Sequence, residues 1–229
     1  MSQPIAVVTG AGGGMGRAIV LDLSRTHQVH ALARRPESVA GLPEGVVVHL
    51  GDLRDPDFLD QVAAAAGEVD VLVNAAAIGD PISLADARLD DWTAQLATNV
   101  IAPAELTRRL LPGLRARQGT VVFIGSGAGT RPVPGSAVYT ASKHALRGLA
   151  DVLRIDEAPH RLRVVTIAPG QTDTPMLRSG HATTGREYTP ERYLRPESVA
   201  RAVRHVVDAP ADVQITDMAV RPRVEINRL

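Results

Sequence analysis

The stretch from Ser126 to Lys143 holds three side chains that together suit acid–base chemistry. Tyr139 and Lys143 are four residues apart in a segment of helical periodicity, which places both side chains on one helix face. Ser126 follows Thr120–Ile124, an apolar run that predicts a buried strand. It therefore lies at a strand's carboxyl end, where open α/β sheets bind their ligands.

These residue types suit proton exchange with an alcohol or carbonyl oxygen. A phenol has an ordinary pKa of about 10 and is a poor acid or base at neutral pH. A nearby ammonium group lowers that pKa, and a serine hydroxyl can hold the reacting oxygen while charge develops on it. The alternative is an ordinary surface helix that carries a tyrosine and a lysine. Motifs elsewhere in the chain are needed to distinguish these two interpretations.

The N-terminal segment has the pattern of a phosphate-binding turn. The apolar run Ile5–Thr9 leads directly into a glycine-rich stretch that ends at Gly16, and a helical pattern follows. Gly10, Gly14 and Gly16 allow a tight turn and the close approach of a pyrophosphate, while the helix N-terminus offers N–H groups. Placed between a strand and a helix, this turn predicts a dinucleotide site; a simple turn is the alternative.

Strand-length apolar runs alternate with helical patterns along the whole chain. We expect strands at Ile5–Thr9, Gln28–Ala33, Val46–Leu50, Asp70–Asn74, Thr120–Ile124, Leu162–Ala168 and Val213–Val220. We expect helices after Gly16, at Pro56–Ala66 with Asp55 as its N-cap, and at Asp90–Leu111, Ala137–Ile155 and Pro196–Val207. This order predicts an α/β, doubly wound Rossmann fold: a single parallel seven-stranded sheet with helices on both faces. Residues 1–229 would form one domain, in which the polar, irregular residues 175–195 are a substrate lid.

Composition excludes several classes of function. With 229 residues the chain can bury one sizeable core without disulfides, and it contains no cysteine, as expected in a reducing compartment such as the cytoplasm. Its 25 basic and 25 acidic residues balance, so we expect neither a nucleic-acid nor a membrane partner. The seven histidines have no metal-ligand spacing, and no metal site is expected.

Taken together, these motifs resemble the short-chain dehydrogenase/reductase family over nearly the whole chain. The matching positions are T-G-x-x-x-G-x-G at Thr9–Gly16, the helical asparagine Asn99, the serine Ser126, Y-x-x-x-K at Tyr139–Lys143 and P-G-x-x-x-T at Pro169–Thr174. The family's N-N-A-G is replaced by Asn74–Ala77, which keeps only small residues beside the cofactor. The C-terminal I-T-D-M-A-V-R-P looks more like the subgroup similar to 3-hydroxy-acid and serine dehydrogenases.

The resemblance implies roles for individual residues. Tyr139 would be the general acid/base, Lys143 would lower its pKa, Ser126 would bind the substrate oxygen, and Asn99 would fix a water in a proton relay. The implied cofactor-binding residues are Gly10, Gly14, Met15, Gly16, Arg34, Asp52, Leu53, Asn74, Ala75, Ala76, Tyr139, Lys143, Pro169, Gly170, Thr172 and Thr174. Relatives commonly pair two long helices across two-fold axes, so a homodimer or homotetramer is expected.

The end of the second strand indicates the cofactor. NAD-preferring relatives place an acidic residue where this chain has Ala33, and the next residue, Arg34, can offer a charged donor fork to a 2′-phosphate. We therefore expect an oxidoreductase that prefers NADP(H) over NAD(H) and interconverts a secondary alcohol and a ketone on a small molecule. The alternative is a dinucleotide-binding sensor or scaffold that has lost the chemistry; Ser126, Tyr139 and Lys143 favour the enzyme because all three are retained.

Overall fold

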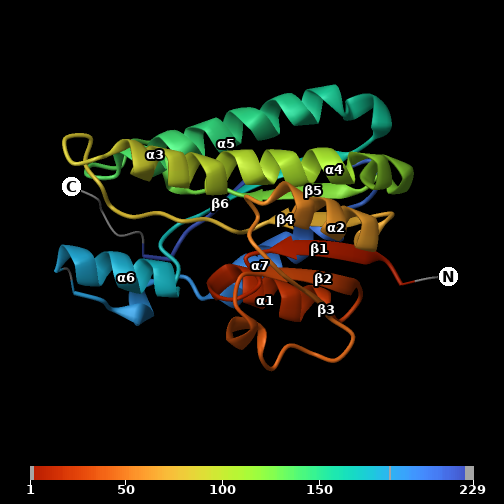
Figure 1. Cartoon of the computed structure of the whole chain (residues 1–229), viewed down its shortest axis with the longest axis horizontal. Coiled ribbons are helices and arrows are strands. Elements are labelled where there is room, and N and C mark those ends of the chain that lie inside the picture. Colours follow the sequence, from red (N-terminus) through yellow and green to blue (C-terminus); the bar gives the residue numbers. More distant parts are fainter. Residues whose placement is uncertain (1–2, 186, 225–229) are drawn as a thin grey trace.

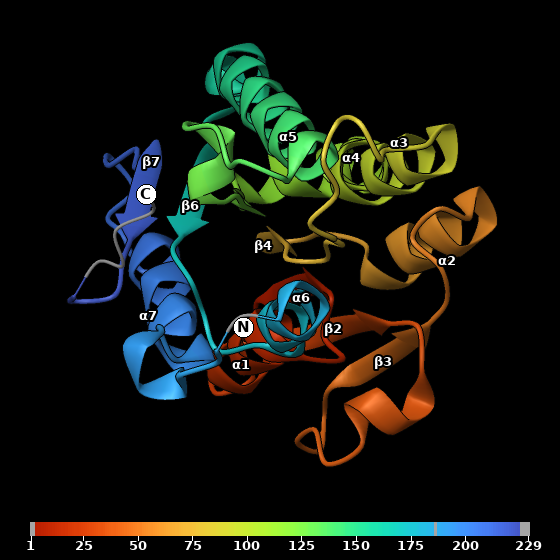
Figure 2. The same cartoon turned by 90° about the vertical axis from the view of Figure 1, so that its left-hand side faces the viewer.

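The computed structural model describes residues 3–185 and 187–224, and their strands form one parallel sheet. Along the sheet the order is β3-β2-β1-β4-β5-β6-β7, which confirms the predicted doubly wound fold (Figures 1 and 2). The strands are β1 (Ile5–Thr9), β2 (Gln28–Ala33), β3 (Val47–Leu50), β4 (Val71–Asn74), β5 (Thr120–Ile124), β6 (Arg163–Pro169) and β7 (Asp217–Val220).

Helices cover both faces of this sheet, as Figure 2 shows. They are α1 (Gly14–Leu23), α2 (Pro56–Ala66), α3 (Leu89–Leu96), α4 (Ala102–Arg117), α5 (Ala137–Asp156), α6 (Pro175–Thr184) and α7 (Pro196–Val207). One core cluster joins the sheet to α1 and α7, and the other joins it to α2, α4 and α5. Because both faces are covered, a central strand such as β5 is apolar almost throughout and completely buried. None of the helices in the described ranges is long and apolar enough to cross a membrane.

The helix predicted at Asp90–Leu111 is longer than expected and interrupted. Helical structure runs from α3 to α4, and a π-helical turn at Ala97–Ile101 separates the two. A π turn accommodates one extra residue in a helix, and such turns are frequent at functional sites. Asn99 lies inside this turn and is fully buried.

The expectation that residues 175–195 are irregular is wrong for the first half of the segment, which forms α6. Thr174 caps this helix by accepting a hydrogen bond from the Leu177 N–H at 3.3 Å, Pro175 opens it, and Gly185 ends it in the left-handed region. These are the preferred residue types at an N-cap, a first helical position and a C-cap. The polar composition of the segment concealed these signals.

Segment 171–194 is closed on itself at its base. Leu194 donates to the carbonyl of Gln171 at 2.9 Å and accepts from the Asp173 N–H at 2.8 Å. Inside the segment Asp173 pairs with Arg178 at 2.7 Å and accepts from the Tyr188 hydroxyl. In Figures 1 and 2 this segment lies beyond the edge of the sheet at which the strands end.

The last strand is shorter than predicted. We expected Val213–Val220, but only Asp217–Val220 pairs with β6 as a strand. The residues before Asp217 contact β6 without forming a strand. In one of these contacts the Gln214 side chain donates a hydrogen bond to the Val164 carbonyl at 2.8 Å. The other strand boundaries agree with the prediction to within one residue.

Candidate functional site

The turn between β1 and α1 can be made only with glycine at three positions. Gly10 and Gly14 have φ values of 71° and 49°, which L side chains rarely adopt. A Cβ on Gly10 would lie 2.9 Å from the Cα of Ala76, and one on Gly16 would overlap the carbonyl oxygen of Gly10. Helix α1 then begins after Gly13 with no side-chain cap, which leaves its first N–H groups for a ligand.

A threonine hydroxyl joins this turn to the end of β4. The Oγ1 of Thr9 accepts hydrogen bonds from the N–H groups of Ala75 and Ala76, both at 3.0 Å. Small side chains at Ala75 and Ala76 let this backbone pass close to the glycine turn. Ala75, which replaces the family's second asparagine, therefore leaves room for this close approach.

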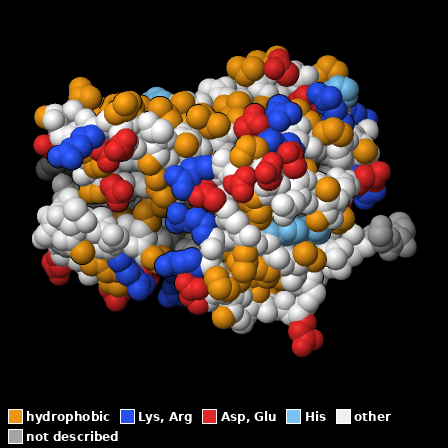
Figure 3. Space-filling view, viewed as in Figure 1, with side chains coloured by type: hydrophobic (Ala, Val, Ile, Leu, Met, Phe, Trp, Pro, Cys, Tyr) orange, Lys and Arg blue, Asp and Glu red, His pale blue; other side chains and the backbone are white. Residues whose placement is uncertain are grey.

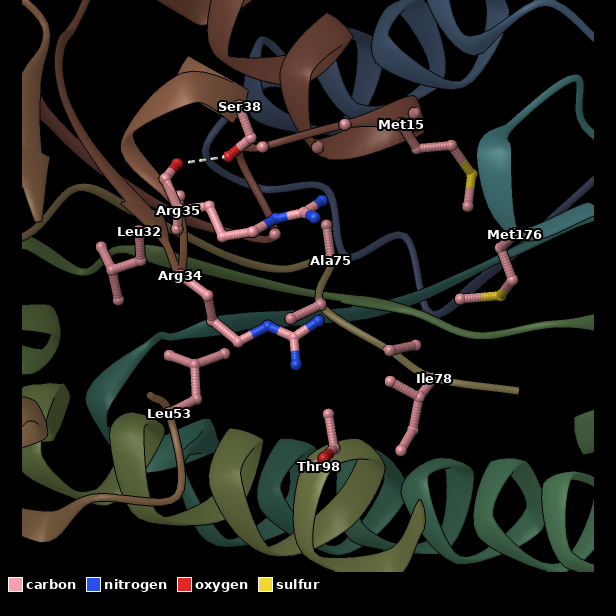
Figure 4. A pocket seen from close by; sticks show the side chains of 18 of the residues that line it. Met15, Leu32, Arg34, Arg35, Ser38, Leu53, Ala75, Ile78, Thr98 and Met176 are labelled. Carbon is pink, nitrogen blue, oxygen red and sulfur yellow. Dashed lines mark hydrogen bonds between the residues drawn. The ribbon is translucent and has the colours of Figure 1, made fainter. Parts of the chain in front are cut away.

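A pocket opens at the carboxyl ends of β1, β2 and β4 (Figure 4). Its lining is Gly10, Gly12–Gly16, Leu32–Arg35, Ser38, Gly51–Arg54, Ala75–Ile78, Thr98 and Thr174–Met176. Ten of the sixteen predicted cofactor-binding residues lie in this lining, namely Gly10, Gly14, Met15, Gly16, Arg34, Asp52, Leu53, Ala75, Ala76 and Thr174. Figure 4 shows Arg34 and Arg35 extending into the pocket and Met15 and Met176 near one another at its other end.

Arg54 lines the pocket but was not predicted from the sequence. It binds the carboxylate of Asp52, a residue that we expected to contact the cofactor. Its guanidinium donates to both oxygens of the Asp52 carboxylate, with Nε at 3.0 Å and 3.1 Å. Mainly through this hydrogen bonding, Arg54 holds the pKa of Asp52 at about 2, and the charge of Arg34 contributes further. The Asp-x-Arg spacing is the only signal in the sequence for this pair. In a pocket that would hold phosphates, Arg54 offsets a negative charge.

Tyr139 and Lys143 lie on one face of α5, as their spacing predicts. The Nζ of Lys143 is 5.7 Å from the centre of the Tyr139 ring and donates to the carbonyl oxygen of Ile124 at 2.9 Å. Lys143 is only 2% exposed, and burial lowers its pKa from 10.5 to about 8. The hydrogen bond ties the helix to the end of β5, two residues before Ser126.

Ser126 begins a short turn that packs directly on α5. Its Oγ accepts a hydrogen bond from the Ala128 N–H at 3.1 Å. Gly129, in the same turn, approaches α5 so closely that a Cβ there would lie 2.9 Å from the Lys143 carbonyl oxygen. The fold thus brings the turn after Ser126 against the helix that carries Tyr139 and Lys143.

Asn99 makes three hydrogen bonds that fix the loop after β4. Its amide pairs with Ile78 in both directions: Oδ1 accepts from the backbone N–H at 2.9 Å, and Nδ2 donates to the carbonyl at 2.8 Å. Nδ2 also donates to Ser142 Oγ at 3.0 Å, and Ser142 in turn donates to the Tyr139 carbonyl at 2.8 Å. The neighbouring Gly79 touches the phenol, because a Cβ there would lie 2.7 Å from two atoms of the Tyr139 ring.

The remaining predicted residues lie outside the pocket lining. Asn74 is buried and turned toward α4, where its Nδ2 donates to Thr107 Oγ1 at 3.3 Å. Thr172 is buried in the turn after β6, and its hydroxyl donates to the Gly170 carbonyl at 3.0 Å. Pro169, Asn99, Ser126, Tyr139 and Lys143 are likewise absent from the lining. The pocket therefore contains part of the predicted site, and the predicted catalytic residues Ser126, Tyr139 and Lys143 lie outside its lining.

A dinucleotide fits the observed cradle. The glycine turn has no space for side chains, and the open N-terminus of α1 faces the pocket. Three arginines, Arg34, Arg35 and Arg54, line the same pocket, and among the described residues of the lining Asp52 is the one acid. A phosphate-bearing ligand suits this balance of charge.

Known proteins are similar in sequence to this chain. A sequence profile of the short chain dehydrogenase family matches residues 4–184. An uncharacterised short-chain type dehydrogenase/reductase of Sinorhizobium fredii is 33% identical, covering 97% of this chain and 92% of the relative. A glycine betaine reductase of Emericella nidulans is 32% identical over 98% of this chain, although the chain spans only 19% of that relative's length.

The similarity extends to solved structures. The closed form of a serine dehydrogenase complexed with NADP+ is 28% identical, with a TM-score of 0.85, and the match covers 98% of this chain and 99% of that one. The profile match over most of the chain and the near-full-length relatives identify the family independently of any single residue. The chain therefore belongs to the short-chain dehydrogenase/reductase family and is an oxidoreductase that acts on CH–OH groups.

Proposed function

We propose that the protein is an NADP(H)-dependent oxidoreductase that interconverts a secondary alcohol and a ketone on a small molecule, with Tyr139 as general acid/base. The observation that carries this proposal is the hydrogen bond from Lys143 Nζ to Ile124. It holds the ammonium group near the Tyr139 ring and beside the turn of Ser126. These contacts support a proposal in which Ser126, Tyr139 and Lys143 act together beside the dinucleotide cradle.

Each of these side chains would have a separate task. NADP(H), when bound, supplies or accepts the hydride. The Tyr139 hydroxyl exchanges a proton with the substrate oxygen, which the Ser126 hydroxyl holds in place. With a pKa of about 8, Lys143 remains mostly protonated at neutral pH, so its charge favours the phenolate form of Tyr139. Asn99 aligns the phenol through Ile78 and Ser142.

The charge around the pocket supports a preference for NADP(H). Ala33 provides no acid to repel a 2′-phosphate, and Arg34 and Arg35 extend into the space beside it (Figure 4). The negative charge of Asp52 is paired with Arg54, which donates a hydrogen bond to its carboxylate. The similar serine dehydrogenase was solved with NADP+, which is consistent with the same choice here.

Replacement of the phenol hydroxyl tests the proposal. Tyr139→Phe should reduce kcat by about three orders of magnitude or more while the Kd for NADPH stays within about threefold, because only the proton donor is lost. Substrates would come from a panel of ketones, oxo acids and sugars, followed by NADPH absorbance. The melting temperature of the variant is the control for folding, because the substitution removes one hydroxyl and keeps the ring. A purified Tyr139→Phe variant that kept more than about a tenth of the wild-type rate would refute the assignment.

We also propose that the protein assembles as a homodimer or homotetramer through the outer surfaces of α4 and α5. Ile101 just before α4 is 57% exposed, and Val152 and Ile155 on α5 are 57% and 71% exposed. Figure 3 shows hydrophobic side chains along the upper edge of the molecule, where Figure 1 places α5. Burial of such side chains between copies would stabilise the helix that carries Tyr139. A cytoplasmic location stays a prediction from the sequence.

A further inference from the structure

A second pocket lies at the edge of the sheet opposite the dinucleotide cradle. It has a volume of about 300 Å³ and is formed by the C-terminal ends of α4 and α5, the start of β6 and the chain before β7. In Figure 1 these helix ends lie at the right of the molecule, whereas α6 lies at the left, beyond the carboxyl edge of the sheet. The described residues of the two linings do not overlap. A ligand in the second pocket would therefore not compete with a dinucleotide.

Positive charge gathers in this second pocket. Three arginines line it: Arg154 from α5, Arg161 from the turn after α5, and Arg163 from β6. Asp212 is the one acid among the described residues of the lining. Within the described part of the chain, neither Arg161 nor Arg163 forms an ion pair with a carboxylate. Arginine keeps its charge at physiological pH, so two positive charges remain in the lining after Asp212 is counted.

Neutral acceptors alone hold the guanidinium of Arg163. It donates hydrogen bonds of 2.8–3.4 Å to four backbone carbonyls and one hydroxyl, those of Val206, Ala209, Pro210, Val213 and Thr120. Burial lowers the pKa of Arg163, because the charge has lost water without gaining a carboxylate in its place. These bonds fix the chain before β7 and leave a positive charge at the pocket. An anion in the pocket would supply the counter-charge.

Arg154 has one nitrogen for which the described chain provides no acceptor. Its Nη2 donates to the Asp151 carboxylate at 2.8 Å, but its Nη1 is buried and has no hydrogen-bond partner among the described residues. Buried N–H groups are almost always hydrogen-bonded. Asp151 itself does not line the pocket. After a small rotation of the guanidinium, an oxyanion in the pocket would serve as the acceptor.

The backbone of the lining is strained at two positions. Gln118 and Arg161 have φ values of 50° and 58°, and in the described chain they are the two residues other than glycine with positive φ. Both line this pocket. Glycine is usual in the left-handed region, because a Cβ there costs free energy. Strained residues of this kind cluster at ligand sites. Here the strain keeps an amide and a guanidinium in the lining, where a glycine would suit the backbone better.

We propose that this pocket binds a phosphate group, either free or carried by a small molecule, with Arg161 as the direct clamp and Arg163 as a fixed counter-charge. A phosphate monoester carries a charge of about −1.5 to −2 at neutral pH, which matches the two positive charges of the lining. A guanidinium fork binds phosphate through two parallel hydrogen bonds. A single carboxylate would balance only one of these charges. The inference does not depend on the proposed function, because the pocket is separate from Ser126, Tyr139 and Lys143.

The experiment uses protein saturated with NADP+, so that the dinucleotide cradle is filled and cannot take up the added phosphate. Calorimetric titrations with inorganic phosphate and with methyl phosphate compare wild type, Arg161→Gly and Arg25→Met. Methyl phosphate is chosen because it has no secondary alcohol for the reaction centre to oxidise. Arg161→Gly removes the guanidinium and suits the φ of 58°, so it should fold at least as stably as wild type. Arg25, an exposed arginine at the same edge of the sheet and in neither lining, is the matched control.

Wild type and Arg25→Met should bind both anions saturably, with a Kd of about 1 mM or tighter, and Arg161→Gly should bind them about ten- to a hundred-fold more weakly. Tighter binding of methyl phosphate would identify an ester as the ligand, and tighter binding of inorganic phosphate would identify the free ion; either order supports a phosphate site. Arg161→Asn, which also tolerates the left-handed region, should show the same loss if Arg161→Gly does not fold.

Melting temperatures give an independent measurement. Phosphate stabilises most proteins at high concentration by exclusion from their surface, and this effect does not saturate. Binding to the pocket adds a rise in melting temperature that saturates at low concentration, and this part should disappear in Arg161→Gly while it persists in Arg25→Met. Equal binding by wild type and Arg161→Gly would overturn the proposal, and so would wild type that binds neither anion saturably.

Discussion

Gly79 offers a direct test of how the proposed general acid is held in position. The loop after β4 presses Gly79 against the phenol, and a Cβ added there would lie 2.7 Å from Cδ2 and Cε2 of Tyr139. Non-bonded carbon atoms prefer a separation of about 3.5–4.0 Å, so an alanine requires a displacement of about 1 Å. The question is which of the two partners moves.

The surrounding hydrogen bonds indicate that the ring moves. The loop is fixed at Ile78, whose N–H and carbonyl are both bonded to the buried Asn99. The backbone of Tyr139 is fixed through its carbonyl, which accepts from Ser142. The side-chain torsions of Tyr139 are softer than either, so the phenol oxygen would leave its place by about 1 Å. Displacements of this size reduce turnover by about a hundred-fold.

The assay separates catalysis from folding and from cofactor binding. Gly79→Ala should reduce kcat by about a hundred-fold, lower the free energy of unfolding by about 1–3 kcal/mol, and leave the Kd for NADPH nearly unchanged, because Gly79 does not line the pocket. Gly148→Ala is the matched control: it lies on the same helix as Tyr139, and nothing is within 4 Å of its added Cβ. It should keep wild-type kcat and gain about 1 kcal/mol of stability from helix propensity. If Gly79→Ala folds and keeps kcat within about threefold of wild type, the loop does not position the phenol.

Three further outcomes are expected. Ala33→Asp with Arg34→Leu should lower the ratio of kcat/KM for NADPH to that for NADH by about ten- to a hundred-fold, and an unchanged ratio would show that Arg34 does not bind the phosphate. The pKa of Lys143 is lowered from 10.5 in the unfolded chain to about 8 in the folded protein. Between pH 8 and pH 10.5 the unfolded chain therefore binds more protons than the folded protein, so the free energy of unfolding rises with pH. In urea denaturation without cofactor, Lys143→Met should thus be more stable than wild type by up to about 3 kcal/mol below pH 8, the gap narrowing toward pH 10.5; a gap that does not change with pH would contradict the assignment. Light scattering at micromolar concentration should show a dimer or tetramer, and a mass of only 24.2 kDa would exclude the proposed pairing of α4 and α5.

Features of the fold and of the site that are formed by residues close together in the sequence were predictable. The glycine turn, the cap of α2 by Asp55, and the Tyr139–Lys143 face each lie within a few residues, so residue type and spacing define the geometry. The apolar runs likewise predict every strand of the sheet, since parallel strands covered on both faces leave a continuous apolar signature.

Features made by distant segments were not predictable. Asn99 binds Ile78, 21 residues away, and Ser142, 43 residues away. The sequence next to Asn99 does not predict either contact. The contact of Gly79 with Tyr139 arises in the same way. Helix α6 is a different case. Its capping residues are local in sequence, but its sequence has no periodic run of apolar residues from which a helix could be predicted.

The closed base of segment 171–194 bears on the entropy of ligand binding. Fixing the backbone of a loose chain costs about 1–2 kcal/mol per residue, which would make the closure of such a long segment expensive. Here the Thr172–Leu194 bridge and the Asp173–Arg178–Tyr188 cluster already hold the segment together. A closing movement would then change only a few torsions next to that bridge and carry Met176 with it as part of one body. Less of the binding free energy would then be spent on fixing the described parts of the segment, residues 171–185 and 187–194, because these contacts already hold them together.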